Sequence, residues 1–296
     1  MMNFNDFMNY VTDNTTVEGG LITREVSKNN DTKYTAFTRK EAVGSMQALV
    51  NANDMYNAYK YGDDIDNIVR KVDEIINKPS PYNIDFNNIE PNFMVRLINL
   101  KKNAKRLKES GALYKEFLDL AIELRLIVSQ DENGYATCQV NNNLLEQMGI
   151  AFEDAYQIAI DKVNKEVKFN TMIEVMLGLK DKDKDFEESI ELARELENEY
   201  PMYILTNKTN LNGAVSMIVK DRLDIICDAL NVDDIYILPS SVHEVIIIPK
   251  TDSLDADVLQ DMIENANETA VEDEDYLSYH PYLYNKVGHN YEVVVA

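Results

Sequence analysis

The segment 233–250 constrains the fold of this chain more than any other stretch. It reads Asp-Asp-Ile-Tyr-Ile-Leu-Pro-Ser-Ser-Val-His-Glu-Val-Ile-Ile-Ile-Pro-Lys. Two runs rich in Ile, Val, Leu and Tyr flank Pro239-Ser240-Ser241, a pattern that predicts two neighbouring strands joined by a tight reversal. Residues 245–248 are apolar at every position, so both faces of this strand should be covered, as in an interior strand. We therefore expect this hairpin to lie in the core.

Hydrophobic patterning predicts a mixture of helices and hairpins along the rest of the chain. Apolar residues at helical spacing predict helices at 3–12, 53–62, 65–78, 142–148, 152–167, 186–199, 220–230 and 255–270. Alternation and turn signals predict hairpins of 21–27 with 33–38 and of 117–128 with 135–140, and strands at 93–100, 202–206, 214–219 and 291–295. Because most strands occur as hairpins with helices between them, the sequence predicts an α+β fold with mainly antiparallel sheets.

The length of 296 residues suits one large domain or two smaller ones. We expect an N-terminal α+β subdomain over residues 1–130 and a C-terminal α+β subdomain over residues 131–296, which contains the central hairpin. One continuous domain is the alternative. The segment 79–91, which has three prolines and many asparagines, is a further candidate boundary.

The net charge is the unusual feature of the composition. Fifty-two acidic residues against 29 basic residues give a net charge of −23. Such a charge repels phosphate backbones and anionic lipid, so direct binding to nucleic acid or to a membrane is not expected. An acidic surface could instead meet a basic protein partner or imitate nucleic acid, and a surface that only keeps the protein soluble would explain the charge as well.

The sequence predicts a soluble cytoplasmic protein. Residues 1–7 show no basic region followed by an apolar run, and no apolar run approaches the ~20 residues that span a bilayer. Cys138 and Cys227 are single, distant cysteines, as is typical of proteins in a reducing compartment.

The reversal of the central hairpin carries the best candidate for chemistry, formed by Ser240, Ser241, His243 and Glu244. On a strand, Ser241 and His243 would point to the same face, so that a serine–histidine pair is geometrically possible. The sequence shows neither a third group that would orient the histidine nor a glycine-flanked nucleophile elbow. In the alternative interpretation, which we prefer, the serines form the turn and His243 makes hydrogen bonds within the sheet.

Metal and cofactor sites are not expected. His243, His280 and His289 lack the spacing of metal ligands, and the ten glycines form no phosphate-binding loop. One basic cluster could hold an anion, but in so acidic a chain we expect it to pair with carboxylates instead. It consists of Lys101, Lys102, Lys105, Arg106 and Lys108.

Four segments carry a resemblance to a known family. They are Leu238-Pro-Ser-Ser-Val-His-Glu-Val245, Met202-Tyr-Ile-Leu-Thr-Asn207, Phe117-Leu-Asp-Leu-Ala-Ile122 and Tyr56-Asn-Ala-Tyr59. In order and spacing, over most of the chain, they resemble an uncharacterised domain of unknown function from gut anaerobic bacteria with a C-terminal Leu-Pro-Ser-Ser-Val-His-Glu motif. The resemblance implies no activity, substrate or catalytic residue.

The sequence therefore supports three hypotheses. The leading one is a non-enzymatic binding or interaction protein with a strongly acidic surface offered to a basic protein partner. The second is a hydrolase-like enzyme that uses Ser240 or Ser241 with His243. The third is an acidic nucleic-acid mimic that binds a basic protein.

Overall fold

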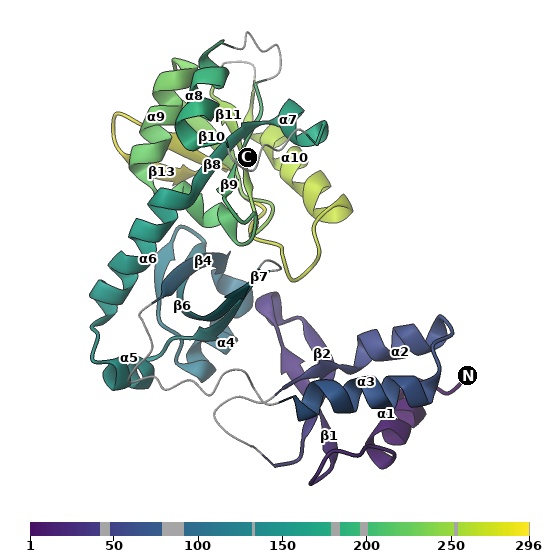
Figure 1. Cartoon of the computed structure of the whole chain (residues 1–296). Coiled ribbons are helices and arrows are strands. Elements are labelled where there is room, and N and C mark those ends of the chain that lie inside the picture. The colour runs from purple at the N-terminus through teal and green to yellow at the C-terminus, as the bar shows by residue number, and fades with distance from the viewer. Residues whose placement is uncertain are drawn as a thin grey trace. The chain divides into compact units, whose positions relative to one another are not determined.

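The computed structural model describes residues 1–41, 48–78, 92–131, 134–178, 184–195, 201–251 and 254–295. The chain divides into two compact units, Met1–Ile89 and Glu90–Ala296 (Figure 1). The described strands form three sheets in which every pairing is antiparallel, and helices alternate with them along the chain. This confirms the predicted α+β class.

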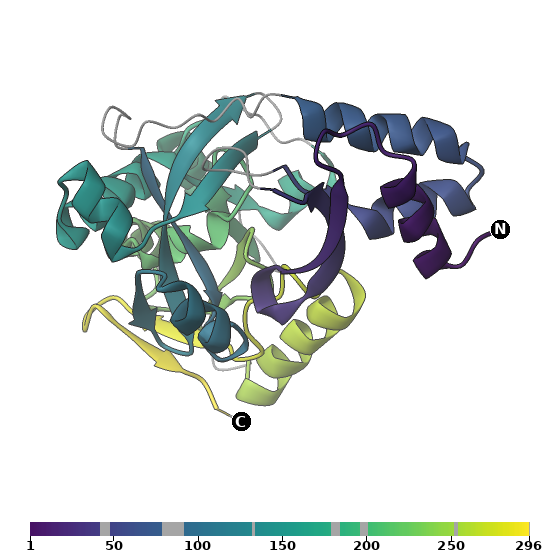
Figure 2. The ribbon, with the colours of Figure 1, turned by 90° about the horizontal axis from the view of Figure 1, so that it is seen from below.

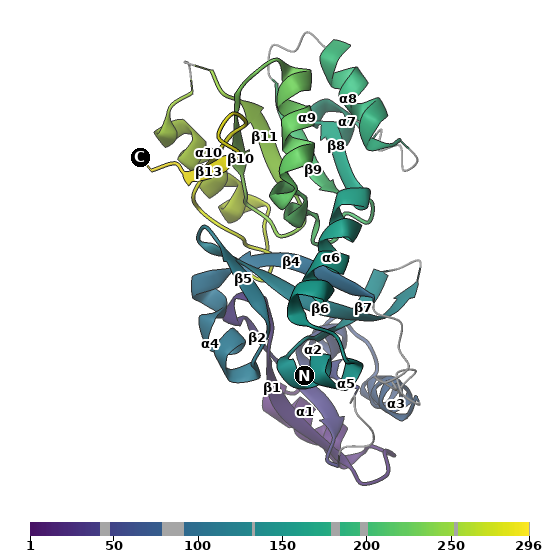
Figure 3. The ribbon, with the colours of Figure 1, turned by 90° about the vertical axis from the view of Figure 1, so that its left-hand side faces the viewer.

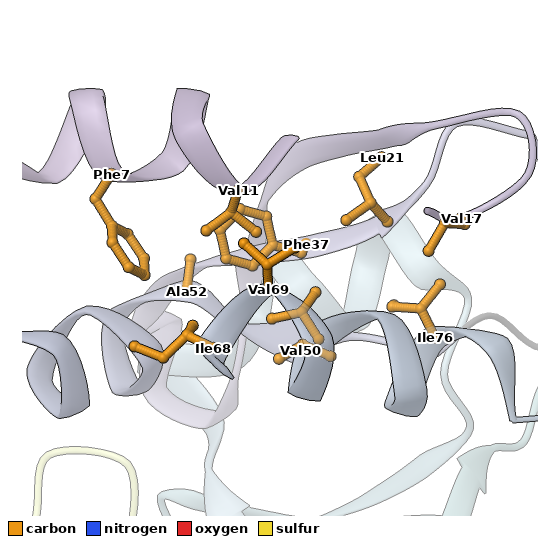
Figure 4. Packing of buried hydrophobic residues seen from close by; sticks show 11 residues of the cluster. Phe7, Val11, Val17, Leu21, Phe37, Val50, Ala52, Ile68, Val69 and Ile76 are labelled. Atoms are coloured by element: carbon orange, nitrogen blue, oxygen red, sulfur yellow. The ribbon is translucent and has the colours of Figure 1, made fainter. Parts of the chain in front are cut away.

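The first unit packs three helices against a small sheet. Its elements are α1 (Phe4–Asp13), β1 (Leu21–Ser27), β2 (Lys33–Arg39), β3 (Val50–Asn51), α2 (Ala52–Lys60) and α3 (Ile65–Asn77). As predicted, β1 and β2 form a hairpin. The apolar stripes of the helices meet β2 in one buried cluster that includes Phe7, Val11, Phe37, Ile68 and Val69 (Figure 4).

A buried carboxylate ties α3 to the loop after α1. Asp73 accepts hydrogen bonds from the hydroxyl of Thr15 at 2.5 Å and from the amide and hydroxyl of Thr16, both at 2.7 Å. A charge out of contact with water requires such donors, because an unpaired buried charge is costly. Asp73 therefore stabilises the first unit rather than standing free for a ligand.

The second unit begins with a four-stranded sheet centred on one long strand. Its elements are β4 (Phe93–Asn99), α4 (Leu100–Ser110), β5 (Tyr114–Phe117), β6 (Leu120–Asp131) and β7 (Gly134–Gln139). β6 pairs with β4 along one edge and with β5 and β7 along the other. Helix α4 packs against one end of the sheet through Ile98, Leu107 and Ala121 (Figure 2).

A six-stranded sheet forms the rest of the second unit. Its strands are β8 (Val167–Thr171), β9 (Tyr203–Asn207), β10 (Asp234–Leu238), β11 (Val245–Pro249), β12 (Tyr282–Asn285) and β13 (Asn290–Val293), in the order β13-β12-β10-β11-β9-β8. Helices α8 (Phe186–Glu195) and α9 (Lys220–Leu230) lie on one side and α10 (Ala256–Thr269) on the other (Figure 3). The remaining helices are α5 (Asn142–Met148), α6 (Phe152–Glu166) and α7 (Met172–Met176).

The predicted central hairpin is confirmed. β10 and β11 pair antiparallel in the middle of the six-stranded sheet, and Val245 and Ile247 are fully buried. On the opposite face, Ile248 packs against Leu259 and Ile263 of α10. The strand is covered on both sides, as its continuous apolar run indicated.

One predicted strand is wrong, and one predicted domain boundary differs. Residues 214–219 were expected to form a strand, but Gly213–Ile218 form a 3₁₀ helix, η2, buried on several sides. A short apolar run cannot distinguish a strand from a buried helical segment, which explains the error. The boundary expected at residue 130 falls inside the β6–β7 hairpin, whose strands share backbone hydrogen bonds, and the two units divide between Ile89 and Glu90. The other candidate boundary, 79–91, lies outside the described residues.

No helix in the described part of the chain combines the length and the apolar character needed to cross a membrane.

Candidate functional site

The loop 239–244 between β10 and β11 brings the four predicted site residues together. Ser240 is buried, and its carbonyl accepts a hydrogen bond from the amide of Leu277 at 3.1 Å. Ser241 forms an isolated bridge with Tyr276, and its hydroxyl accepts a hydrogen bond from the backbone amide of His243 at 3.1 Å. Since these residues form a loop, the strand alternation expected for Ser241 and His243 does not apply. The serine hydroxyl therefore contacts the backbone of His243 and not its ring.

Both ring nitrogens of His243 have partners in the fold. Nδ1 accepts a hydrogen bond from the backbone amide of Asn212, and Nε2 lies 3.2 Å from Oδ1 of Asp275. Because Nδ1 accepts, the neutral ring carries its proton on Nε2 and donates it to Asp275. The hydrogen bond and charge of Asp275 raise the pKa of His243 above its ordinary 6.5 and outweigh the opposing effect of burial. Glu244 lies half-buried beside it.

The loop before η2 extends these contacts. Asn212, which adopts a left-handed conformation, donates from its side chain to the hydroxyl of Tyr135 at 2.8 Å. The Tyr135 hydroxyl in turn lies 3.2 Å from the carbonyl of Leu211 and donates to it. A continuous set of hydrogen bonds thus runs from Tyr135 on β7 through Asn212 and His243 to Asp275, and it connects the four-stranded sheet to the loop 239–244.

Gly213 is required where this loop approaches β9. A Cβ atom at this position would lie 2.2 Å from Oγ1 of Thr206 and 2.6 Å from the carbonyl oxygen of His243. The same Thr206 hydroxyl donates to that carbonyl at 2.8 Å. Because a side chain at residue 213 would displace backbone atoms, the glycine sets the position of His243.

A small cavity lies beside Tyr135. Its volume is about 40 Å³, and Lys162, Glu166 and Asn207 are among the residues that line it. That volume suits a few water molecules, whereas pockets for small-molecule ligands measure about 300–1,000 Å³. His243 is not among the lining residues. The cavity therefore does not give the histidine access to a substrate-sized space.

The other predicted candidates lie apart from this loop. His280 is exposed, and Nδ1 of His289 lies 3.2 Å from Oδ2 of Asp224. Within the ranges that the structure describes, no group of three His, Cys, Asp or Glu side chains is arranged to hold a metal ion. Burial raises the pKa of the Cys227 thiol to about 12, so this cysteine is a poor nucleophile.

The sequence interpretation missed a charged cluster on the four-stranded sheet. Glu123 on β6 is fully buried and contacts Arg96 on β4, Arg106 on α4 and Arg125 on β6. A signal was present, because Arg96 interrupts the apolar run of β4, and Glu123 and Arg125 occupy alternate positions in the apolar first part of β6. Charged residues inside such strands indicate either a buried ion network or a site.

These features define an α+β protein of two units, in which the hairpin histidine is held by its own fold. The chain belongs to a family of unknown function, DUF5688, whose sequence model matches residues 4–286. The resemblance to a domain of unknown function is thereby confirmed over nearly the whole chain. Comparison with curated proteins found no match, and neither did comparison with solved structures.

Proposed function

We propose that this chain is a non-enzymatic binding protein that presents an acidic helix face to a basic protein partner. The observation that carries the proposal is a row of carboxylates on α10. The four residues recur at helical spacing, so they share one face, and all four are exposed. They are Asp257, Asp261, Glu264 and Glu268.

The packing of the helix does not require this row. α10 is held on the sheet by Leu259 and Ile263, which lie on its buried face. Like charges one turn apart weaken a helix by about 0.2–0.5 kcal/mol per pair. Asp257 lies in the first turn, where a negative charge favours the helix, but Asp261, Glu264 and Glu268 oppose it and contribute nothing to the core. These three are therefore better explained by a contact with a partner.

Local cations do not neutralise the row. The sequence contains no Lys or Arg between Lys250 and Lys286. Within the described part of the chain, no ion pair reaches the four carboxylates, although Glu264 accepts a hydrogen bond from Gln260 at 2.9 Å. A partner with several Lys or Arg side chains would supply the missing positive charge.

The hydrolase alternative has less support. A general base must be free to take a proton from its nucleophile, and the nitrogens of His243 contact Asn212 and Asp275 instead of Ser240 or Ser241. A catalytic role for Ser240, Ser241, His243 and Glu244 stays a prediction. Its simplest test is a screen with ester, amide and phosphoester substrates in which wild type is compared with His243→Ala.

The proposal includes a cytoplasmic location, for which Cys138 and Cys227, both free thiols, are the supporting observation. Origin in gut anaerobic bacteria, and the role of Leu-Pro-Ser-Ser-Val-His-Glu as a family motif, also stay predictions.

The test uses two variants that lose the same charge from different surfaces. The first neutralises the α10 row through Asp257→Asn, Asp261→Asn, Glu264→Gln and Glu268→Gln. The control neutralises four exposed carboxylates elsewhere in the second unit, through Glu146→Gln, Asp154→Asn, Glu191→Gln and Glu195→Gln. A partner retained by wild type from extracts of the host cell is purified, and its affinity for the three proteins is measured over a range of salt concentrations.

We expect the α10 variant to bind the basic partner at least roughly tenfold more weakly and with a smaller salt dependence, and the control to match wild type within about threefold. Equal losses in the two variants, or a partner without net positive charge, would contradict the proposal. If duplex DNA competes with wild type for the same partner, the nucleic-acid mimic is the better description.

A further inference from the structure

Three arginines surround one buried carboxylate on the four-stranded sheet, beside helix α4. Glu123 and Arg96 are direct cross-strand partners, with Nη2 of Arg96 2.7 Å from Oε2. Arg106 of α4 donates from Nη1 to Oε1 at 2.8 Å, and Nη1 of Arg125 lies 3.4 Å from the same oxygen. Two strands and one helix thus direct their guanidinium groups to a single point.

The charges in this cluster do not balance. Three guanidinium groups and one carboxylate leave two positive charges in excess. Glu123 is fully buried, and the arginine side chains are only 15–20% exposed, so that water screens the excess weakly. Within the described residues, no second carboxylate lies in ion-pair distance of these arginines. Partly buried charges are ordinarily paired, and an additional anion would complete the pairing.

Donor groups remain for such an anion. Nη1 of Arg96 makes no hydrogen bond within the described part of the chain, although Nε and Nη2 of the same residue both contact Glu123. The crowding of cations is also visible in Arg125, because burial and the charge of Arg96 lower its pKa to about 10. A bound anion would relieve this repulsion.

The helix that supplies Arg106 carries further positive charge on its exposed face. Lys101, Lys105 and Lys108 are exposed on α4, and in the described ranges none of them has a carboxylate within ion-pair distance. The expectation that the basic cluster pairs with carboxylates is therefore confirmed for Arg106, and for these lysines it stays a prediction. Lys102 lies over the ring of Tyr276, 3.9 Å from its centroid.

We propose that the arginine cluster, defined as Arg96, Arg106 and Arg125, binds a small multivalent oxyanion, with phosphate as the expected group. The planar guanidinium fork matches the paired oxygens of phosphate and carboxylate groups. A long nucleic acid is a poorer ligand, because it would meet the field of a chain with net charge −23. A small anion senses mainly the charges within a Debye length, which is ~8 Å at physiological salt.

The test is a calorimetric titration of the full chain with inorganic pyrophosphate and, separately, with citrate. We expect saturable binding of pyrophosphate with a dissociation constant of about 1 mM or lower at low salt. Arg96→Gln should weaken it by roughly tenfold or more, since a charged hydrogen-bond donor is lost. Arg24→Gln removes the same group from exposed strand β1 and should leave the affinity unchanged.

A second variant keeps the test decisive if Arg96→Gln does not fold. The double change Lys101→Gln and Lys105→Gln lies on the exposed face of α4 and should weaken binding by about threefold or more while circular dichroism stays unchanged. Tighter binding of citrate would support the oxyanion site and assign it to carboxylates. Single-stranded DNA is titrated as a third ligand. The proposal is overturned if neither small anion binds at about 10 mM, or if only the DNA binds. It is also overturned if Arg96→Gln and the double lysine variant both bind as wild type does.

Discussion

Replacement of Glu123 by Gln removes the buried negative charge of the arginine cluster while preserving the size of the side chain. Burial alone would raise the pKa of Glu123, but the charge of Arg96 and the hydrogen bond from Arg106 lower it from the ordinary 4.5 to about 2. That difference corresponds to about 3 kcal/mol of stability at neutral pH. Removing one partner of a buried ion network typically costs about 3–5 kcal/mol. We therefore expect Glu123→Gln to destabilise the second unit by about 3 kcal/mol.

The stability contributed by Glu123 depends on pH in a definite direction. Because the pKa of Glu123 is lowered in the folded state, its contribution to stability is complete above pH 4.5 and is lost as the pH falls toward about 2. The difference between wild type and Glu123→Gln should therefore be largest near neutral pH and shrink in acid. Urea unfolding followed by circular dichroism and tyrosine fluorescence measures it, since the chain has 17 tyrosines and no tryptophan.

The matched control is Glu153→Gln. Glu153 pairs with Lys115 at 2.6 Å, but its side chain is 72% exposed, so the loss should be at most about 0.5 kcal/mol. A stability of Glu123→Gln within about 1 kcal/mol of wild type at neutral pH would refute the role of the buried charge. An equal loss of stability in wild type and Glu123→Gln on acidification would refute it as well.

Three further predictions concern single residues. His243→Gln should lower the free energy of unfolding by about 0.5–1 kcal/mol below pH 6.5 and by less at higher pH, because a group with a raised pKa stabilises the fold only while it is charged. Urea unfolding at pH 5.5 and 8.5 measures the effect, and equal losses of stability at the two pH values would contradict the contact with Asp275. Gly213→Ala should lower the free energy of unfolding by about 2–4 kcal/mol, because its Cβ would clash with Thr206 and His243. The control Gly149→Ala is strained only by its φ of 65° and should lower it by about 1 kcal/mol. Thermal unfolding compares the two variants, and a smaller loss of stability for Gly213→Ala than for Gly149→Ala would refute the clash. Asp73→Asn should destabilise the first unit by about 1–3 kcal/mol, and unchanged hydrogen-exchange protection of α1 and α3 would refute its role.

The helices and hairpins could be predicted wherever local signals agree with the tertiary environment. The bounds of α5 and α9 match those predicted from sequence, because Asn141 caps the first helix and the left-handed Gly149 and Asn231 end the two. Strand β11 was recognisable from its continuous apolar run. At residues 213–218 the local signal is ambiguous, and burial against neighbouring elements determines the 3₁₀ helix.

The surroundings of the candidate site could not be predicted from the sequence. The ring of His243 contacts Asn212 and Asp275, which lie about thirty residues away on either side, and no local pattern specifies such pairs. The position of Ser241 depends on its bridge to Tyr276, which turns the expected tight reversal into a longer loop. Glu123 and Arg96 were recognisable as charged residues in apolar strands, but their pairing depends on the register of β4 with β6.

The most direct test of the proposed function is hydrogen exchange of the full chain, with and without the purified basic partner. We predict slower exchange of backbone amides along α10 when the partner is bound, and loss of this protection in the variant whose α10 row is neutralised. Protection confined to the loop 239–244 or to other elements, with α10 unchanged, would contradict the account.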